Sequence, residues 1–325
     1  MKNIVIIGGG TGTFTLLSGL RQFPSNNTVI VASSDDGGSA GRLRKELGVF
    51  PPGDLRQCLV GLSYTEALMK EMFLYRFDKG SLAGHTAGNI ILAALEKMTG
   101  SVEKTIEIAS KILNVRGQVL PVTLKPTRLS AVLENGQKII GEHNIDEPRI
   151  HRTSPIASMA LSPKTRANIK ALKALAAADV IIFGPGDLYT GIVPNLLVSG
   201  VKEAVNKSKA KKILVSNIMT KHGQSDGFTA SVFVEELQKY LGGKIDAVVV
   251  NSKKPDFKLL NRYRKEKAEF VKIDRDNLKK QNIQIFEGAL LSTETFEKPS
   301  GDVLIRSFLR HDSQKTAKII WQLIN

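Results

Sequence analysis

The chain has 325 residues, of which 42% are hydrophobic, and its 46 Lys and Arg outnumber its 31 Asp and Glu to give a formal net charge of +15. This length and apolar fraction are typical of a globular protein with a large core, and they exclude a disordered chain. The positive charge fits acidic ligands such as nucleotides, but it fits a generally basic, soluble surface equally well.

The single cysteine, Cys58, excludes a disulfide within the chain, and its apolar helical surroundings predict core packing. The apolar run before Gly8 is too short for a signal peptide, and no later segment approaches the length of a membrane-spanning helix. We therefore expect a cytoplasmic protein without a membrane span.

The first motif is a β-branched run over residues 2–7 that ends in glycines at positions 8, 9, 10 and 12 and is followed by an apolar helical pattern. This order predicts a strand, a tight loop and a helix. Glycines let the backbone approach a ligand closely, and the free N–H groups at a helix start point at an anion. We predict a phosphate-binding loop whose candidate residues are Gly9, Gly10, Thr11, Gly12 and Thr13.

The residues in and around this loop exclude one class of phosphate-binding loop and argue against another. A Walker-type loop is excluded because no Lys stands at the helix start. A dinucleotide fingerprint would place its third glycine where this chain has Thr13, and the acidic residues that follow the second strand, Asp35 and Asp36, lie in a loop rather than at the strand end. An NAD-dependent oxidoreductase therefore remains only as the weakest alternative.

The region after this loop adds two candidate ligands. Arg42 lies close in sequence to both loops, and a guanidinium group suits phosphate oxygens. Asn89 opens a strongly apolar helix, where it either contacts ligand or hydrogen-bonds to the helix start. Between them, Asp54 follows a Pro-Pro-Gly turn, and we expect it to cap a helix that continues to Arg76.

Short alternating strands predict an antiparallel β-rich insertion at about residues 118–160, with strands at 119–122, 128–133 and 138–141. The Asn135-Gly136 pair is the hairpin signal between the last two strands. The insertion either covers the site, mediates dimerisation or does neither.

A second site signal follows a predicted helix at 163–177. A buried strand at 178–183 ends in a glycine-proline loop with one acid, and a later strand at 211–215 ends in a long polar loop at 216–228. Ligands of open α/β sheets bind at the carboxyl ends of strands, where these loops lie. The candidate residues are Gly184, Pro185, Gly186, Asp187, Tyr189 and Asn217.

The remaining chain contains a segment at 253–280 in which Lys and Arg alternate with acids and aromatics are few, so a solvated helical surface is favoured over a nucleic-acid site. A helix at 316–323 is expected to pack on the sheet. No repeat or linker interrupts residues 1–325. We predict one α/β domain with a Rossmann-like, doubly wound, mainly parallel sheet and the small antiparallel insertion.

Taken together, these motifs resemble the YvcK-type gluconeogenesis-factor family, which is related to the CofD phospholactate transferases. The resemblance spans nearly the whole chain and depends on residues 8–13, 34–39, 41–44, 51–56, 88–89 and 184–190. It implies a Rossmann-like core that binds the nucleotide sugar UDP-N-acetylglucosamine, and a role in cell shape and wall synthesis during gluconeogenic growth. It implies no established catalytic activity, and it implies a partner among cell-wall or regulatory proteins.

Three hypotheses follow. In the first, a regulatory protein holds a nucleotide-sugar diphosphate at residues 10–13 and a sugar hydroxyl, a ribose hydroxyl or magnesium at Asp35 and Asp36, while loops 184–190 and 217–225 close over the ligand. In the second, the resemblance to the transferases implies a magnesium-dependent phosphotransferase of the 2-phospho-L-lactate type, with Asp36 as the metal ligand. The third is the oxidoreductase. Assembly into a homo-oligomer is left open.

Overall fold

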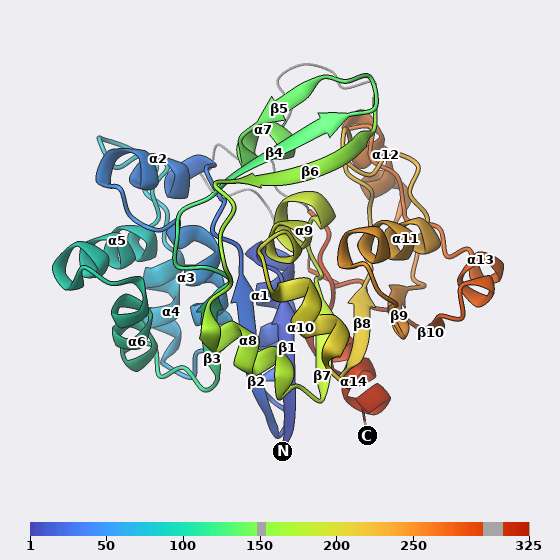
Figure 1. Cartoon of the computed structure of the whole chain (residues 1–325), viewed down its shortest axis with the longest axis horizontal. Coiled ribbons are helices and arrows are strands. Elements are labelled where there is room, and N and C mark those ends of the chain that lie inside the picture. The colour runs from blue at the N-terminus through green and yellow to red at the C-terminus, as the bar shows by residue number, and fades with distance from the viewer. Residues whose placement is uncertain (148–153, 295–307, 325) are drawn as a thin grey trace.

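The computed structural model describes residues 1–147, 154–294 and 308–324, which form two β-sheets with helices packed around the larger one (Figure 1). The larger sheet is parallel throughout and has the order β10-β9-β8-β7-β1-β2-β3. Its strands are β1 (Lys2–Ile7), β2 (Ser25–Val31), β3 (Gln118–Pro121), β7 (Val180–Phe183), β8 (Lys211–Val215), β9 (Ala247–Asn251) and β10 (Gln284–Gly288).

The central strands are apolar on both faces, as parallel strands covered by helices on each side must be. Ile4 and Ile6 of β1 belong to one core, and Val5 and Ile7 belong to the other. The first core is covered by α1 (Gly10–Leu20), α3 (Pro52–Gly61), α5 (Ala87–Thr99), α6 (Val102–Ile112) and α14 (Ser313–Ile324). The second is covered by α8 (Ile169–Ala176), α9 (Val193–Leu196), α10 (Val201–Lys207) and α11 (Ala230–Leu241).

The strand order reverses between β1 and β7, because β2 and β3 follow on one side of β1 while β8, β9 and β10 follow β7 on the other. This is the doubly wound α/β fold that the sequence predicts. The loops after β1 and β7 leave the same edge of the sheet at the switch point, which is the usual ligand position in open α/β sheets.

The small sheet has the order β5-β4-β6 and is antiparallel. Its strands are β4 (Arg128–Leu133), β5 (Lys138–Ile140) and β6 (Ile156–Ser162), and the short helix α7 (Glu142–Asp146) follows β5. It lies beyond the carboxyl ends of the parallel strands (Figure 1). The predicted hairpin between β4 and β5 is confirmed.

One strand predicted for the insertion lies elsewhere. Residues 118–121 form β3, which pairs in parallel with β2 and completes one edge of the main sheet. The small sheet therefore begins at Arg128 and ends at Ser162. Residues 148–153, which the prediction also included, lie outside the described residues.

Two predicted helices have different bounds. The helix expected over 54–76 is interrupted between α3 and α4 (Ala67–Leu74), because the chain there turns toward the end of α6. The Ser63 hydroxyl donates to Leu113 O, and the Arg116 N–H donates to Leu62 O. The helix expected over 163–177 begins only at residue 169. The remaining described helices are α2 (Gly38–Leu47), α12 (Phe257–Lys265), α13 (Arg275–Lys280) and the π-helix η1 (Leu188–Ile192).

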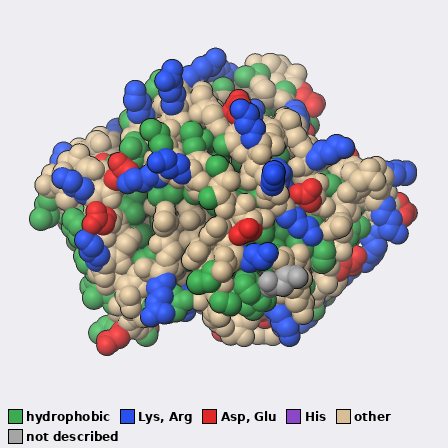
Figure 2. All heavy atoms as spheres, turned by 60° about the horizontal axis from the view of Figure 1, so that its bottom comes forward, with side chains coloured by type: hydrophobic (Ala, Val, Ile, Leu, Met, Phe, Trp, Pro, Cys, Tyr) green, Lys and Arg blue, Asp and Glu red, His purple; other side chains and the backbone are tan. Residues whose placement is uncertain are grey.

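On the face that Figure 2 shows, Lys and Arg side chains are scattered and Asp and Glu side chains lie among them. The segment at 253–280 forms the largely exposed helices α12 and α13, as predicted, and Arg275 pairs there with Glu287 at 2.6 Å. This distribution does not define a single basic stripe.

Gly19 tests how closely α1 packs against α14. A Cβ atom on Gly19 would lie 2.0 Å from the carbonyl oxygen of Ser313, so Gly19→Ala must displace α14. We expect a loss of about 1–3 kcal/mol in the free energy of unfolding, measured by urea denaturation. Gly191→Ala is the matched control, because a Cβ there meets no described atom within 4 Å. Equal stability of the two variants would contradict this account of the packing.

Candidate functional site

The loops after β1 and β7 contact each other backbone to backbone. A Cβ atom on Gly12 would lie 2.4 Å from the carbonyl oxygen of Pro185, and one on Gly186 would lie 3.6 Å from the carbonyl oxygen of Gly9. The Thr13 hydroxyl is fully buried and donates to Pro185 O at 3.4 Å. Gly12, Thr13 and Pro185, all predicted ligand residues, thus hold the two loops together.

The start of α1 has the backbone geometry of an anion-binding site. Gly9 is its N-cap in an extended conformation, and Gly10 has a φ of +68°, which favours glycine. As a glycine, this N-cap residue has no side chain that could accept from the first N–H groups, and the first turn contains no acid. Gly10 and Thr11 are partly exposed. The first N–H groups of α1 can therefore donate to a phosphate group.

Asp54 was predicted to cap a helix, but Pro51 is the N-cap of α3 and Asp54 lies in its first turn without capping it. Its carboxylate packs against the loop after β1: a Cβ atom on Gly9 would lie 2.0 Å from Asp54 Oδ2. A side chain at position 9 would require the Asp54 carboxylate to move. Asp54 therefore brings a negative charge close to the start of α1, which the sequence did not indicate.

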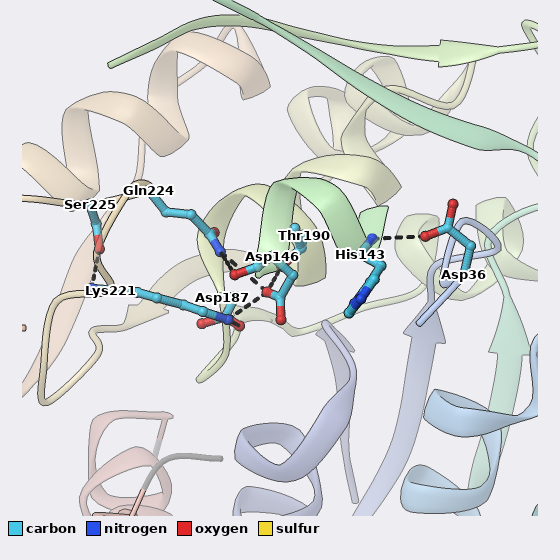
Figure 3. Close-up of polar contacts among 8 residues, drawn as sticks. All are labelled: Asp36, His143, Asp146, Asp187, Thr190, Lys221, Gln224 and Ser225. Carbon is cyan, nitrogen blue, oxygen red and sulfur yellow. Dashed lines mark hydrogen bonds and ion pairs between the residues drawn. The ribbon is translucent and has the colours of Figure 1, made fainter. Parts of the chain in front are cut away.

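Other carboxylates gather beside it. The Gly37 N–H donates to Asp35 Oδ1 at 2.9 Å, and the His143 N–H donates to Asp36 Oδ1 at 2.8 Å (Figure 3). Burial and the nearby charge of Asp54 raise the pKa of Asp35 to about 7. Burial, with several neighbouring carboxylates, also raises the pKa of Glu142 well above its usual range. A carboxyl group with a pKa near 7, such as that of Asp35, can both donate and accept hydrogen bonds at neutral pH, so this cluster suits hydroxyl groups or a cation.

Lys221, in the loop after β8, lies between two carboxylates. Its Nζ is 2.5 Å from Asp146 Oδ1 and 2.8 Å from Asp187 Oδ2 (Figure 3). The same oxygen of Asp146 accepts from Thr190 Oγ1 at 3.0 Å and from Gln224 Nε2 at 3.2 Å.

Lys221 and Asp146 each stabilise the charged form of the other. Burial alone would lower the pKa of Lys221, but the two carboxylates outweigh it and raise that pKa. Burial would raise the pKa of Asp146, but Lys221 outweighs it and lowers that pKa to about 2. Asp187 differs, because burial outweighs Lys221 and raises its pKa. Lys221 and Asp146 are therefore both charged at neutral pH.

Three predicted site residues make contacts within the fold. Arg42 is exposed and donates to Ala83 O at 2.8 Å. Tyr189 is buried in η1, and its hydroxyl donates to Glu236 Oε2 at 3.0 Å on α11. Asn217 is half-buried in the loop after β8.

Asn89 belongs to a buried hydrogen-bond network. Its Oδ1 accepts from Arg56 Nε at 2.8 Å, and its Nδ2 donates to Ser39 Oγ at 3.0 Å. Ser39 Oγ is also 3.1 Å from His85 Nδ1. The network joins α2, α3 and α5 through their side chains. The ligand contact of Asn89 stays a prediction.

Four residues of the site were not predicted as ligands from the sequence: Asp54, Glu142, Asp146 and Lys221. The first was interpreted as a cap and the last lies in a loop that was singled out for its length. Glu142 and Asp146 lie on a five-residue helix inside the insertion. Only a prediction of how the insertion folds onto the core would have placed them here.

Two features are absent from the described residues. No group of three or more His, Cys, Asp or Glu among them is arranged to hold a metal ion. No helix in the described part of the chain has both the length and the apolar character to cross a membrane.

A family model described as 2-phospho-L-lactate transferase CofD matches residues 4–291. The chain belongs to the CofD family. A relative from Thermotoga maritima is 45% identical over 318 residues, covering 98% of both chains. The gluconeogenesis factor of Bacillus subtilis is 39% identical over 326 residues, covering 99% of this chain and 98% of the relative. These matches confirm the resemblance that the motifs predicted.

A solved structure agrees with the family assignment. The crystal structure of a member of the UPF0052 family from Bacillus halodurans is similar to this chain with a TM-score of 0.90 at 39% identity. The similarity covers 98% of this chain and 99% of that one. The fold described above is therefore shared over essentially the whole length.

Asp35 gives a pH-dependent prediction. Its pKa is raised from 3.8 to about 7, so the folded protein holds this proton more tightly than the unfolded chain does. Stability is therefore lost as the pH rises from about 4 to about 7 and is not regained above that range. Asp35→Asn removes the charge, and we expect it to raise the free energy of unfolding by about 1–2 kcal/mol at pH 8 and by less at pH 5.

The measurement is urea denaturation of wild type and variant at both pH values. Asp78→Asn is the control, because Asp78 is exposed, and its effect should not change with pH. A stability gain from Asp35→Asn that is the same at pH 5 and pH 8 would contradict the assignment of a raised pKa to this carboxyl.

Proposed function

We propose that this protein is a cytoplasmic regulatory factor that binds the nucleotide sugar UDP-N-acetylglucosamine at the switch point and serves cell shape and wall synthesis during gluconeogenic growth. The observation that carries the proposal is the glycine-rich start of α1, which lies beside the carboxylates of three further elements. In this arrangement the diphosphate lies at the N–H groups of residues 10–12, which supply fixed donors and a favourable helix dipole.

The carboxylates then contact the uncharged parts of the ligand. Hydroxyl groups of a sugar or ribose donate to carboxylate oxygens, and a partly protonated carboxyl can also donate in return. Asp35 and Asp36 follow β2, the strand next to β1, and they lie beside the loop that binds the phosphate groups. A polyol joined to a diphosphate would contact both the N–H groups at the start of α1 and the carboxylates. Inorganic phosphate alone would contact only the N–H groups.

Magnesium enters the proposal as a partner of the diphosphate. Mg²⁺ is usually held by one or two protein carboxylates together with phosphate oxygens and water, so it does not need three protein ligands. Asp36 is the carboxylate that we propose for it, because its Oδ1 is fixed by the His143 N–H and its other oxygen remains for a cation. The ion would neutralise charge between the acids and the phosphate groups.

The name of the family model raises phosphotransfer as the alternative. Relatives named gluconeogenesis factors cover this chain nearly end to end, and they favour the binding role. An oxidoreductase is less well supported, because the third position of the glycine fingerprint holds Thr13, whose hydroxyl is used for packing on Pro185.

Thr11→Pro tests the phosphate site. Proline removes one N–H in the first turn of α1, where a helix tolerates it, and Thr11→Ala keeps that N–H as a matched control. We expect calorimetric titration with UDP-N-acetylglucosamine to show a Kd about 10–100-fold weaker for Thr11→Pro and little changed for Thr11→Ala, since one hydrogen bond to a charged group is lost.

The titration is repeated with GDP and NAD, each with and without magnesium. Thermal unfolding of both variants verifies that they are folded. Binding of GDP with magnesium in place of the uridine sugar would contradict the proposal and turn attention to an acceptor substrate. Equal loss of affinity in Thr11→Pro and Thr11→Ala would remove the helix start as the phosphate site.

A further inference from the structure

The small sheet and α7, which we call the cap (residues 128–147 and 156–162), contact the core on the carboxyl side of the main sheet. Part of this contact is apolar: Ile145 of α7 is fully buried in the same cluster as Leu188 and Ile192 of η1. The polar residues of α7 make a second set of contacts with loops that follow three different strands of the main sheet.

The first polar contact reaches the loop after β2. The His143 N–H donates to Asp36 Oδ1 at 2.8 Å (Figure 3). The backbone of Asp36 is itself held tightly, because a Cβ atom on Gly41 of α2 would lie 1.9 Å from its carbonyl oxygen. One end of α7 is therefore attached to a rigid part of the core.

The second contact reaches the loops after β7 and β8 at one atom. Asp146 Oδ1 accepts from Lys221 Nζ at 2.5 Å, from Thr190 Oγ1 at 3.0 Å and from Gln224 Nε2 at 3.2 Å. The loop that carries the lysine is ordered by Ser225, whose Oγ accepts from the Lys221 N–H at 2.9 Å (Figure 3). Asp146 is thus the only residue of α7 in these contacts whose side chain joins two core loops.

The two ends of α7 lie in different electrostatic surroundings. Burial, together with the nearby carboxylates of Asp146, Asp35 and Asp36, raises the pKa of Glu142 at the start of α7. Lys221 is the cation that attracts the other end of α7. The Asp146–Lys221 contact acts together with the apolar contact of Ile145 and the hydrogen bond from His143 to Asp36. It is the ion pair among these contacts, and α7 cannot open locally unless it breaks.

We propose that α7 is a latch, fastened by Asp146 to Lys221, Thr190 and Gln224, and that its release opens the cap and sets the rate at which ligand enters and leaves the site at the start of α1. The ligand part rests on the proposed function. The latch itself is a property of the free protein and is tested without ligand.

The first experiment is hydrogen exchange of the ligand-free protein followed by mass spectrometry. Asp146→Asn should raise the exchange rate of the amides of α7, including that of His143, by about tenfold or more, because hydrogen bonds to a charged acceptor are lost. Asp246→Asn is the control: its carboxylate is likewise a hydrogen-bond acceptor, from the Lys212 N–H at 2.7 Å, but at the amino end of β9. It should leave exchange in α7 unchanged.

Lys221→Met and the double variant with Asp146→Asn distinguish loss of the latch from a general loss of folding. If the two residues act as one latch, the double variant should exchange in α7 more slowly than the product of the two single effects predicts. Exchange in β1 and β7 should remain as in wild type. Unchanged exchange in α7 for Asp146→Asn, or loss of protection throughout the sheet, would overturn the latch.

The second experiment measures association and dissociation of UDP-N-acetylglucosamine by stopped flow. A latch that gates entry predicts that Asp146→Asn raises both rate constants, whereas a residue that only contacts ligand would raise dissociation alone. An unchanged or slower association would overturn the gating. Faster exchange in α7 with no binding by wild type or variant would support the latch and reject the proposed ligand.

Discussion

The meeting of two loops at the reversal point of the sheet is the constraint on which the remaining structure depends. The loops after β1 and β7 approach so closely that no side chain fits at Gly12. This contact fixes where α1 starts and how η1 leaves β7. Because η1 and the residue before it carry Thr190 and Asp187, the same contact also fixes the groups to which the cap attaches. The site is therefore built from backbone packing before any charged side chain contributes.

Charge then divides the site into two parts. On the side of α1 and β2, several carboxylates lie together, and burial raises the pKa of Glu142 and raises that of Asp35 to about 7. On the side of β7 and β8, Lys221 holds Asp146 in its charged form. A ligand that carries a diphosphate and hydroxyl groups would satisfy the helix start and the first group of acids, while the second group holds the cap. Binding and cap position are thus linked through one short helix.

The features predicted correctly from the sequence are those that depend on local chemistry. Continuous apolar runs predicted buried parallel strands, and glycines in the loops after β1 and β7 marked the switch point, because a close backbone approach permits no other residue. The hairpin at Asn135-Gly136 was also a local signal. Each of these features could be predicted because the residues that determine it lie within one short segment of the chain.

The features that were missed depend on contacts between distant segments. Residues 118–121 have the pattern of a strand in either sheet, and only pairing with β2 assigns them to the larger one. Asp146 has no motif, and its role comes from meeting Lys221 across 75 positions of the chain. Thr13 and Asn89, which were predicted to bind ligand, make hydrogen bonds to distant segments that the sequence did not indicate, and their ligand contacts stay predictions.

The most direct test of the account is a crystal structure of the protein with UDP-N-acetylglucosamine. The account predicts diphosphate oxygens at hydrogen-bond distance, about 2.7–3.2 Å, from the N–H groups of residues 10–12, with sugar or ribose hydroxyls at Asp35 or Asp36. A nucleotide sugar bound away from the start of α1, or with its diphosphate turned from that helix, would contradict it.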